Sequence, residues 1–140
     1  MDRIFPQSGV IPFRGTLQHL EILLVTSRSN KRWIIPKGLI EPGLSPQDSA
    51  LQEAYEEAGI RGQIVGGELG HYQYRKWGGV CMVSVYPMKV TEILETWPES
   101  SLRSRKWFKL ENCLNKIREK DLRDLIETLP AYLKNQKDIS

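Results

Sequence analysis

The sequence predicts an α/β fold in one domain over residues 1–140, with helices on both faces of a mixed β-sheet. Three observations lead to this prediction. The chain has 140 residues, 40% of them hydrophobic, which is enough apolar material for one core. Several short runs are rich in Leu, Ile and Val and have the length of strands. Two helical patterns, at 45–59 and 121–133, lie far apart along the chain, so each can cover a different face.

Composition limits the class of protein. The 20 basic and 17 acidic residues give a net charge of +3, which is too small to indicate nucleic-acid binding by itself. Cys81 and Cys113 belong to no CxxC pair, so we expect free thiols rather than a zinc site or a disulfide scaffold. No segment approaches the ~20 apolar residues of a membrane span, and "MDRIFPQSGV" lacks the apolar core of a signal peptide. We therefore expect a cytoplasmic protein that does not bind membranes.

The first forty residues are expected to form strands joined by turns. Their predicted order is a strand at 8–14, a buried strand at 19–27, a polar turn at 28–32, a strand stub at 33–36 and a Gly- and Pro-containing loop at 37–43. Proline cannot donate to a β-ladder, so Pro12 predicts that the first strand lies at an edge or contains a bulge.

The helix at 45–59 has clear signals at both ends. Ser45 is a natural N-cap, Pro46 suits the first helical position, and Gly59 suits the left-handed residue after the last turn. Its apolar stripe is narrow and consists mostly of small residues: Ala50, Leu51, Ala54 and Ala58. We expect this helix to lie close to the element on which it packs.

The second half of the chain is expected to be mostly strands, followed by a helix. The predicted order is a strand at 62–75, a hairpin turn at 76–79, a strand at 79–90, an acidic loop at 93–101, a strand at 104–110, a helix at 121–133 and a frayed end at 134–140. Leu122, Leu125, Ile126 and Leu129 have helical spacing, so the second helix should pack an apolar face on the sheet.

Three carboxylates lie on one face of the first helix. Glu53, Glu56 and Glu57 stand at i, i+3 and i+4, and like charges at this spacing cost an isolated helix roughly 0.2–0.5 kcal/mol per pair. One interpretation is a solvated acidic face. The other is a Mg²⁺ site, because Mg²⁺ prefers oxygen ligands and would turn the mutual repulsion into attraction. Lys37 and Gly38, in the loop directly before the helix, favour the second interpretation.

A longer pattern spans this loop and helix. The order G-x5-E-x7-R-E-U-x-E-E-x-G-U, with U apolar, is matched at Gly38, Glu53, Glu56, Glu57, Gly59 and Ile60. By this pattern, by "WIIPKG" leading into it and by "RKWFKL" after it, the chain resembles the Nudix family. Within the family it looks like the branch of diphosphoinositol polyphosphate phosphohydrolases and dinucleoside polyphosphate hydrolases. The resemblance implies an α/β/α sandwich and Mg²⁺-dependent hydrolysis of a diphosphate linked to another group, with Mn²⁺ as an alternative metal.

Two positions depart from this Nudix box. Leu44 replaces its first Glu, and Gln52 replaces its Arg, which in the family commonly helps to orient the Glu that follows. A paired replacement of polar partners can be nearly neutral for stability. These two departures could change the orientation of Glu53 and thereby the rate of reaction. They also favour a rival hypothesis, in which the domain binds nucleotides as a sensor without hydrolysing them; a protein-interaction domain is a third option.

The resemblance implies roles for the box residues. Glu53, Glu56, Glu57 and the backbone carbonyl of Gly38 would bind the metal, and Glu53 and Glu57 would be the catalytic residues. We take Glu53 as the first candidate for the general base. Acids in the later loop are alternatives, because this role moves within the family: Glu92, Glu95 and Glu99.

The substrate would be a small polyphosphate held by cationic side chains. Our favoured phosphate ligands are Arg14, Arg28, Lys37 and Arg75; Lys31, Arg32 and Lys76 are further candidates. Tyr72 or Trp77 could stack on a base, although aromatic residues on strands are more often in the core. A diphosphoinositol phosphate or a dinucleoside polyphosphate is favoured, and a nucleotide or the 5′ end of an RNA stays open. The protein would be a monomer or a homodimer.

Overall fold

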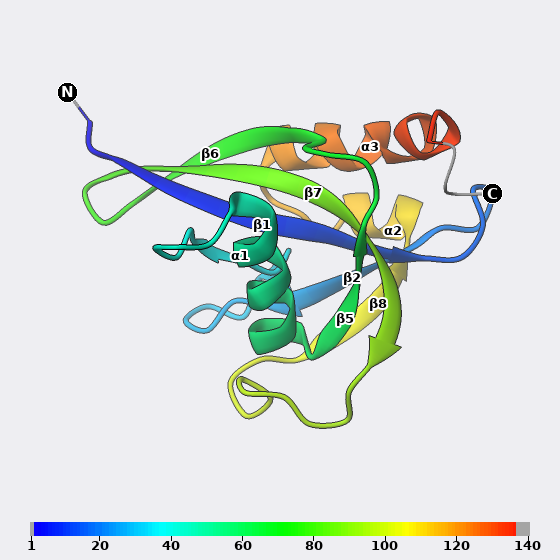
Figure 1. The fold of residues 1–140 in the computed structure, drawn as a ribbon, viewed down its shortest axis with the longest axis horizontal. Helices are drawn as coiled ribbons and strands as arrows, with labels where there is room; N and C mark the ends of the chain where they lie inside the picture. Colours follow the sequence, from blue (N-terminus) through cyan, green and yellow to red (C-terminus); the bar gives the residue numbers. More distant parts are fainter. Residues whose placement is uncertain (1, 137–140) are drawn as a thin grey trace.

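Within residues 2–136, eight strands form one mixed β-sheet, and the helices lie on both of its faces, as the sequence predicts (Figure 1). The computed structural model describes residues 2–136. The elements are β1 (Ile4–Arg14), β2 (Glu21–Thr26), β3 (Trp33–Ile34), β4 (Lys37–Leu39), α1 (Pro46–Glu53), the π-helical turn η1 (Ala54–Ala58), β5 (Ile60–Ile64), β6 (Gly70–Lys76), β7 (Gly79–Ile93), β8 (Arg105–Lys109), α2 (Leu110–Leu114) and α3 (Lys120–Lys134).

Strand β1 lies in the interior of the sheet. It pairs in parallel with β7 from Ile4 to Phe13, and on its other side it pairs antiparallel with β4 and then β2. The predicted edge position of Pro12 is therefore wrong. Pairing with β2 involves only Phe13 and Arg14 and begins directly after Pro12, so the missing N–H group falls where the partner strand changes.

The two faces of the sheet carry separate apolar clusters. On β1, Val10 belongs to the cluster under α1, whereas the next residue, Ile11, belongs to the cluster under α3. The α1 side is built on the alanines expected from the sequence: Ala50, Ala54 and Ala58, all fully buried. The α3 side is built on Leu122, Ile126, Leu129 and Leu133. Figure 1 shows α1 and α3 on opposite sides of β1 and β7.

Two predicted elements need correction, and one helix was missed. The strand expected at 62–75 is two strands, β5 and β6, separated at Gly66, whose φ of +75° suits glycine. The loop expected at 37–43 begins with the short strand β4, which pairs with β1. Helix α2 was not predicted, because five residues are too few to show helical periodicity. Of the frayed end expected at 134–140, residues 137–140 lie outside the described part of the chain.

The hairpin turn expected at 76–79 is confirmed. Lys76 pairs with Gly79, which leaves Trp77 and Gly78 as a two-residue loop with φ of +56° and +70°. Positive φ at both central residues is the type I′ pattern. A bulky residue in the left-handed region costs about 1–2 kcal/mol. The edge-to-face pair of Trp77 with Phe5, at 5.3 Å, returns about 0.5–1.5 kcal/mol, so stability alone does not explain a tryptophan here.

Candidate active site

The acidic helix has the ends that the sequence predicts. The Ser45 hydroxyl accepts a hydrogen bond of 3.0 Å from the backbone N–H of Asp48, and Gly59 adopts a left-handed φ of +64°. Between these residues α1 continues into η1, a wide turn of a kind that is frequent at functional sites. Glu53 and Glu57 are only 9% and 5% exposed. Two carboxylates are thus held inside the protein on consecutive turns of a rigid element.

Glu53 lies directly against the backbone of β4. A Cβ atom on residue 38 would overlap the Glu53 carboxylate, so only glycine permits this approach. Oxygen atoms of Glu41, Glu53 and Glu56 lie within 4.8 Å of one another. A hard divalent cation fits this donor set, since it takes several oxygen ligands at once. The sequence prediction did not include Glu41, although its place three residues after Gly38 in the loop is a usable signal.

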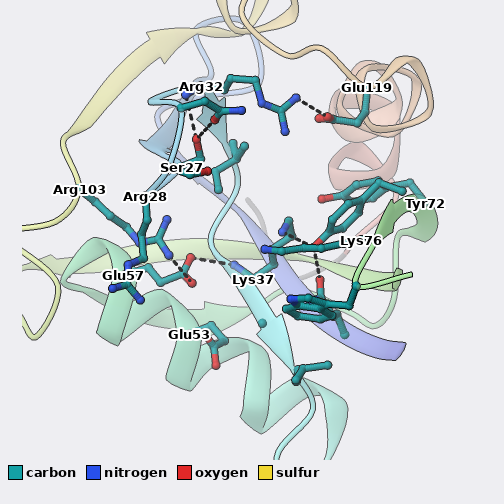
Figure 2. Close-up of a pocket in the computed structure, with 18 of the residues that line it drawn as sticks. Ser27, Arg28, Arg32, Lys37, Glu53, Glu57, Tyr72, Lys76, Arg103 and Glu119 are labelled. Atoms are coloured by element: carbon teal, nitrogen blue, oxygen red, sulfur yellow. Dashed lines mark hydrogen bonds and ion pairs between the residues drawn. The ribbon is translucent and has the colours of Figure 1, made fainter. Parts of the chain in front are cut away.

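Glu57 is held by protein donors (Figure 2). One oxygen accepts from the backbone N–H of Lys37, and the other accepts from Arg103, each at 3.2 Å. The indole N–H of Trp97 donates to the backbone carbonyl of Glu57 at 3.0 Å. Glu57 is therefore oriented from two sides, and it is not one of the three carboxylates that converge.

Arg103 joins three parts of the site. Its side chain is only 9% exposed, and it donates to Glu57, to Glu99 at 2.8 Å and to the backbone carbonyl of Thr26 at 3.0 Å. It thereby fixes the loop after β7 to the end of β2 and to the acidic turn. Arg103 was not singled out from the sequence, because it lies 46 residues from Glu57.

A cavity of about 760 Å³ opens above the acidic turn. Of the four favoured phosphate ligands, Arg28, Lys37 and Arg75 line it, together with Arg32 and Lys76. Arg14 does not: it pairs with Glu21 at 2.7 Å and lies over the Trp107 ring. The cavity thus has an acidic floor and a largely cationic wall.

Several of these cations already have partners. The Lys37 ammonium donates to the Tyr74 hydroxyl at 2.8 Å, Arg75 pairs with Asp2 at 2.9 Å, and Arg32 pairs with Glu119 at 3.1 Å. Figure 2 shows the Arg32–Glu119 pair on the far side of the cavity from Glu53.

The other residues considered from the sequence lie elsewhere. Lys31 donates to the carbonyl of Leu102. Glu92 pairs with Arg61 on the surface, Glu95 does not line the cavity, and Glu99 reaches it only through Arg103.

Comparison with known proteins identifies the family. The NUDIX domain matches residues 5–129. The chain belongs to the Nudix hydrolase family. Nudix hydrolase 16, mitochondrial, of Arabidopsis thaliana is 31% identical over 137 residues, which cover 85% of this chain and 76% of the relative. Diphosphoinositol polyphosphate phosphohydrolase 2 of Mus musculus is 42% identical over 112 residues, which cover 77% of this chain and 60% of the relative. The chain thus spans less than two thirds of the mouse protein.

Solved structures confirm the predicted Nudix fold. An Ap4A hydrolase of C. elegans in a binary complex has a TM-score of 0.78 at 22% identity, with 93% of this chain and 98% of that chain covered. The NUDIX domain of Shewanella oneidensis NrtR complexed with ADP ribose has a TM-score of 0.74 at 21% identity, with 95% and 90% covered. At this level of identity the likeness concerns the fold alone.

Location stays a prediction. Between residues 2 and 136, no helix combines the length and apolar character needed to cross a membrane. The Arabidopsis relative is named mitochondrial, whereas the sequence predicts a cytoplasmic protein.

The two departures from the Nudix box have structural counterparts. At the Arg position, the Gln52 amide donates to Glu56 at 2.7 Å, so a neutral group orients one carboxylate. In this chain the Nudix box contains no arginine. A guanidinium reaches Glu57 from Arg103 instead. Leu44 is partly exposed. The acid nearest to it in the loop, Glu41, belongs to the converging carboxylates.

Burial changes the protonation of the Nudix carboxylates. Burial, with a further contribution from the charge of Glu56, raises the pKa of Glu53 to about 7. Burial also raises the pKa of Glu57 to about 8, although Arg103 opposes the shift. Burial lowers the pKa of Lys37 to about 8. A bound cation would favour the ionised form of both carboxylates.

The metal-free Nudix domain should lose stability as the pH rises from about 4.5 to about 8. Both carboxyls have an ordinary pKa of 4.5, whereas in the folded protein they titrate near 7 and 8. Between these values the folded state binds more protons than the unfolded state, so the free energy of unfolding falls with pH. Thermal melts in EDTA at several pH values would measure this. Added Mg²⁺ should raise the melting temperature most at the highest pH, and Glu53→Gln should flatten the metal-free profile.

Proposed function

We propose that the protein is a Mg²⁺-dependent pyrophosphohydrolase that cuts a phosphoanhydride bond in a nucleoside polyphosphate or a diphosphoinositol-type substrate. One observation carries the proposal: the oxygens of Glu41, Glu53 and Glu56 converge, and two of these residues, Glu41 and Glu53, line a cavity whose wall is largely cationic. A polyphosphate suits this cavity, because its negative charge complements the cationic wall. Its oxygens can also bind the same metal ion as the carboxylates. The name of the mouse relative supports this substrate class.

The metal would be held by the carboxylates of Glu41, Glu53 and Glu56 and by the backbone carbonyl of Gly38. Glu57 can contribute as well, because a carboxylate has about four lone-pair positions and the bonds from Lys37 and Arg103 occupy only two of them. When bound, Mg²⁺ supplies neutralisation of the phosphate charge and lowers the pKa of water.

Side chains of this protein carry out the proton transfer and position the substrate. Glu53 accepts a proton from the attacking water, whose oxygen forms a bond to one phosphorus. The bridging P–O bond breaks, and its electron pair leaves with the departing phosphate. Arg28 and Lys76 bind and orient the phosphate chain, since phosphoryl transfer depends mostly on positioning and on charge stabilisation.

Product analysis with a panel of substrates tests the proposal. ATP, Ap4A, ADP ribose and a diphosphoinositol phosphate would be incubated with the protein, with and without Mg²⁺, and the products separated by ion-exchange chromatography. We expect cleavage of at least one phosphoanhydride bond, only with the metal. No cleavage of any compound would contradict the proposal.

The second candidate is a nucleotide-binding module without catalysis. The neutral Gln52 and the apolar Leu44 favour it, because both reduce the polar support that the box normally gives to its carboxylates. The two functions differ in one measurement. The module would bind one of the nucleotides tightly in calorimetry and leave it intact after long incubation with Mg²⁺.

A further inference from the structure

Trp77 is an exposed aromatic residue that lines the cavity. It lies at the tip of the β6–β7 hairpin, is 53% exposed and lines the same cavity as Glu53 and Arg28. Of the two aromatic residues considered from the sequence for stacking, the other is not available, since Tyr72 is only 2% exposed. Tyr74 is engaged by Lys37 and donates to Gln7 at 2.9 Å. Trp77 is therefore the aromatic side chain of the lining that a ligand can reach most freely.

The backbone at Trp77 is unfavourable for a tryptophan. Its φ of +56° lies in the left-handed region, and a two-residue type I′ turn favours Asn-Gly at its centre. The chain has the glycine, at 78, but a bulky ring at 77. Strained positions of this kind cluster at ligand-binding sites. As the pair with Phe5 roughly balances the strain, the choice of Trp needs a reason other than folding.

The surroundings of Trp77 suit a planar group joined to phosphates. Phe5 meets its ring nearly at right angles, at 77°, and so supports its position. The Lys76 ammonium lies over the same ring, 4.8 Å from its centre, so a cation is held at the aromatic surface. Arg28 and Arg32 line the same cavity, and Glu53 is at its floor. A ligand with an aromatic ring and a phosphate chain matches the chemistry of this lining, which offers the ring of Trp77, several cations and the Glu53 carboxylate.

We propose that Trp77 is a specificity residue that stacks on a nucleobase, so that the site prefers nucleoside polyphosphates over polyphosphates without an aromatic ring. This inference rests on the proposed function and narrows its substrate class. Each DNA or RNA base stacked on an aromatic side chain gains enough for roughly a 10-fold change in affinity. A diphosphoinositol phosphate has no aromatic ring and would gain nothing from Trp77.

A ratio of rates tests the specificity. The kcat/KM values for ATP and for inorganic tripolyphosphate would be measured for wild type, Trp77→Asn and Trp77→Phe. Trp77→Asn fits the turn and removes the ring, so the preference for ATP over tripolyphosphate should fall about 10-fold. Trp77→Phe keeps an aromatic face and should retain most of the preference. An unchanged ratio in Trp77→Asn, or an equal loss for both substrates, would overturn the inference.

Binding without turnover gives a second measurement. The indole N–H resonance of Trp77 is the one missing from the NMR spectrum of Trp77→Asn. In EDTA, ADP should move this resonance, whereas pyrophosphate at the same occupancy should move it little. Equal shifts with both ligands, or none with ADP, would contradict stacking.

The two measurements also separate this inference from the proposed function. If ADP moves the Trp77 resonance but no phosphoanhydride bond is cleaved, the stacking inference stands and the proposed hydrolysis fails. If tripolyphosphate and ATP are both cleaved with the same preference in every variant, the hydrolysis stands and the stacking fails. The Trp77 resonance could instead broaden with protein concentration and stay unchanged when ADP is added. That result would indicate that the exposed ring contacts a second copy of the protein, and it would refute stacking.

Discussion

Glu53→Gln should lower kcat by about 10²–10⁴-fold, the range that removal of a general base usually costs. Glu53 is the carboxylate that lies against Gly38, converges with Glu41 and Glu56 and faces the cavity. Glutamine has the same shape, so the packing should survive. The change also removes a buried charge, and the metal-free protein should be no less stable at pH 8. Steady-state kinetics and thermal melts would measure these two effects.

A matched control tests whether the effect of Glu53→Gln is specific to the site or follows from the loss of any carboxylate. Glu127→Gln removes an exposed carboxylate from α3 and should change neither kcat nor Mg²⁺ affinity. Gly38→Ala keeps Glu53 but adds a Cβ atom that overlaps its carboxylate, so it should reproduce much of the loss. Full activity in Glu53→Gln would remove this residue from the mechanism and direct attention to Glu57.

The acidic helix could be predicted because its signals are local. The cap at Ser45, the left-handed Gly59 and the spacing of Glu53, Glu56 and Glu57 all lie within one short segment, and the structure has the helix with those ends. The α/β/α layers followed from two separated helical patterns and from the resemblance to the Nudix family.

The remaining features depend on contacts between distant segments. Pro12 suggested an edge strand, but the pairing of β1 depends on where β4 and β2 begin, which no local pattern gives. Arg14 was favoured for phosphate because it ends a strand, yet that end carries it to Trp107 and away from the cavity. Arg103 was not singled out from the sequence, because only the fold brings the loop after β7 to Glu57.

Arg103→Met should be the most destabilising single change at the site, by about 3–5 kcal/mol in the free energy of unfolding. Removing one partner of a buried pair leaves the largely buried Glu57 carboxylate without its cation. The loss should grow with pH, because without the guanidinium the pKa of Glu57 rises further and its ionisation costs more. Denaturant unfolding at pH 6 and pH 8 in EDTA would measure both the size and the trend.

A double-mutant cycle distinguishes two roles of Arg103. The residue could stabilise the protein mainly through its ion pair with Glu57, or mainly through its other bonds to the loop and to β2. In Arg103→Met with Glu57→Gln, the more deeply buried carboxylate loses its charge, and only Glu99, whose side chain is 23% exposed, is left without its cation. Much of the lost stability should therefore return, because replacing both partners costs far less than removing one. Activity should stay low, since the carboxylate itself is gone. If the double variant is as unstable as the two single losses added together, the main work of Arg103 is its bonds to Thr26 and Glu99 rather than to Glu57. Recovery of stability without recovery of rate is the result expected if this arginine exists to keep a buried, reactive carboxylate in place.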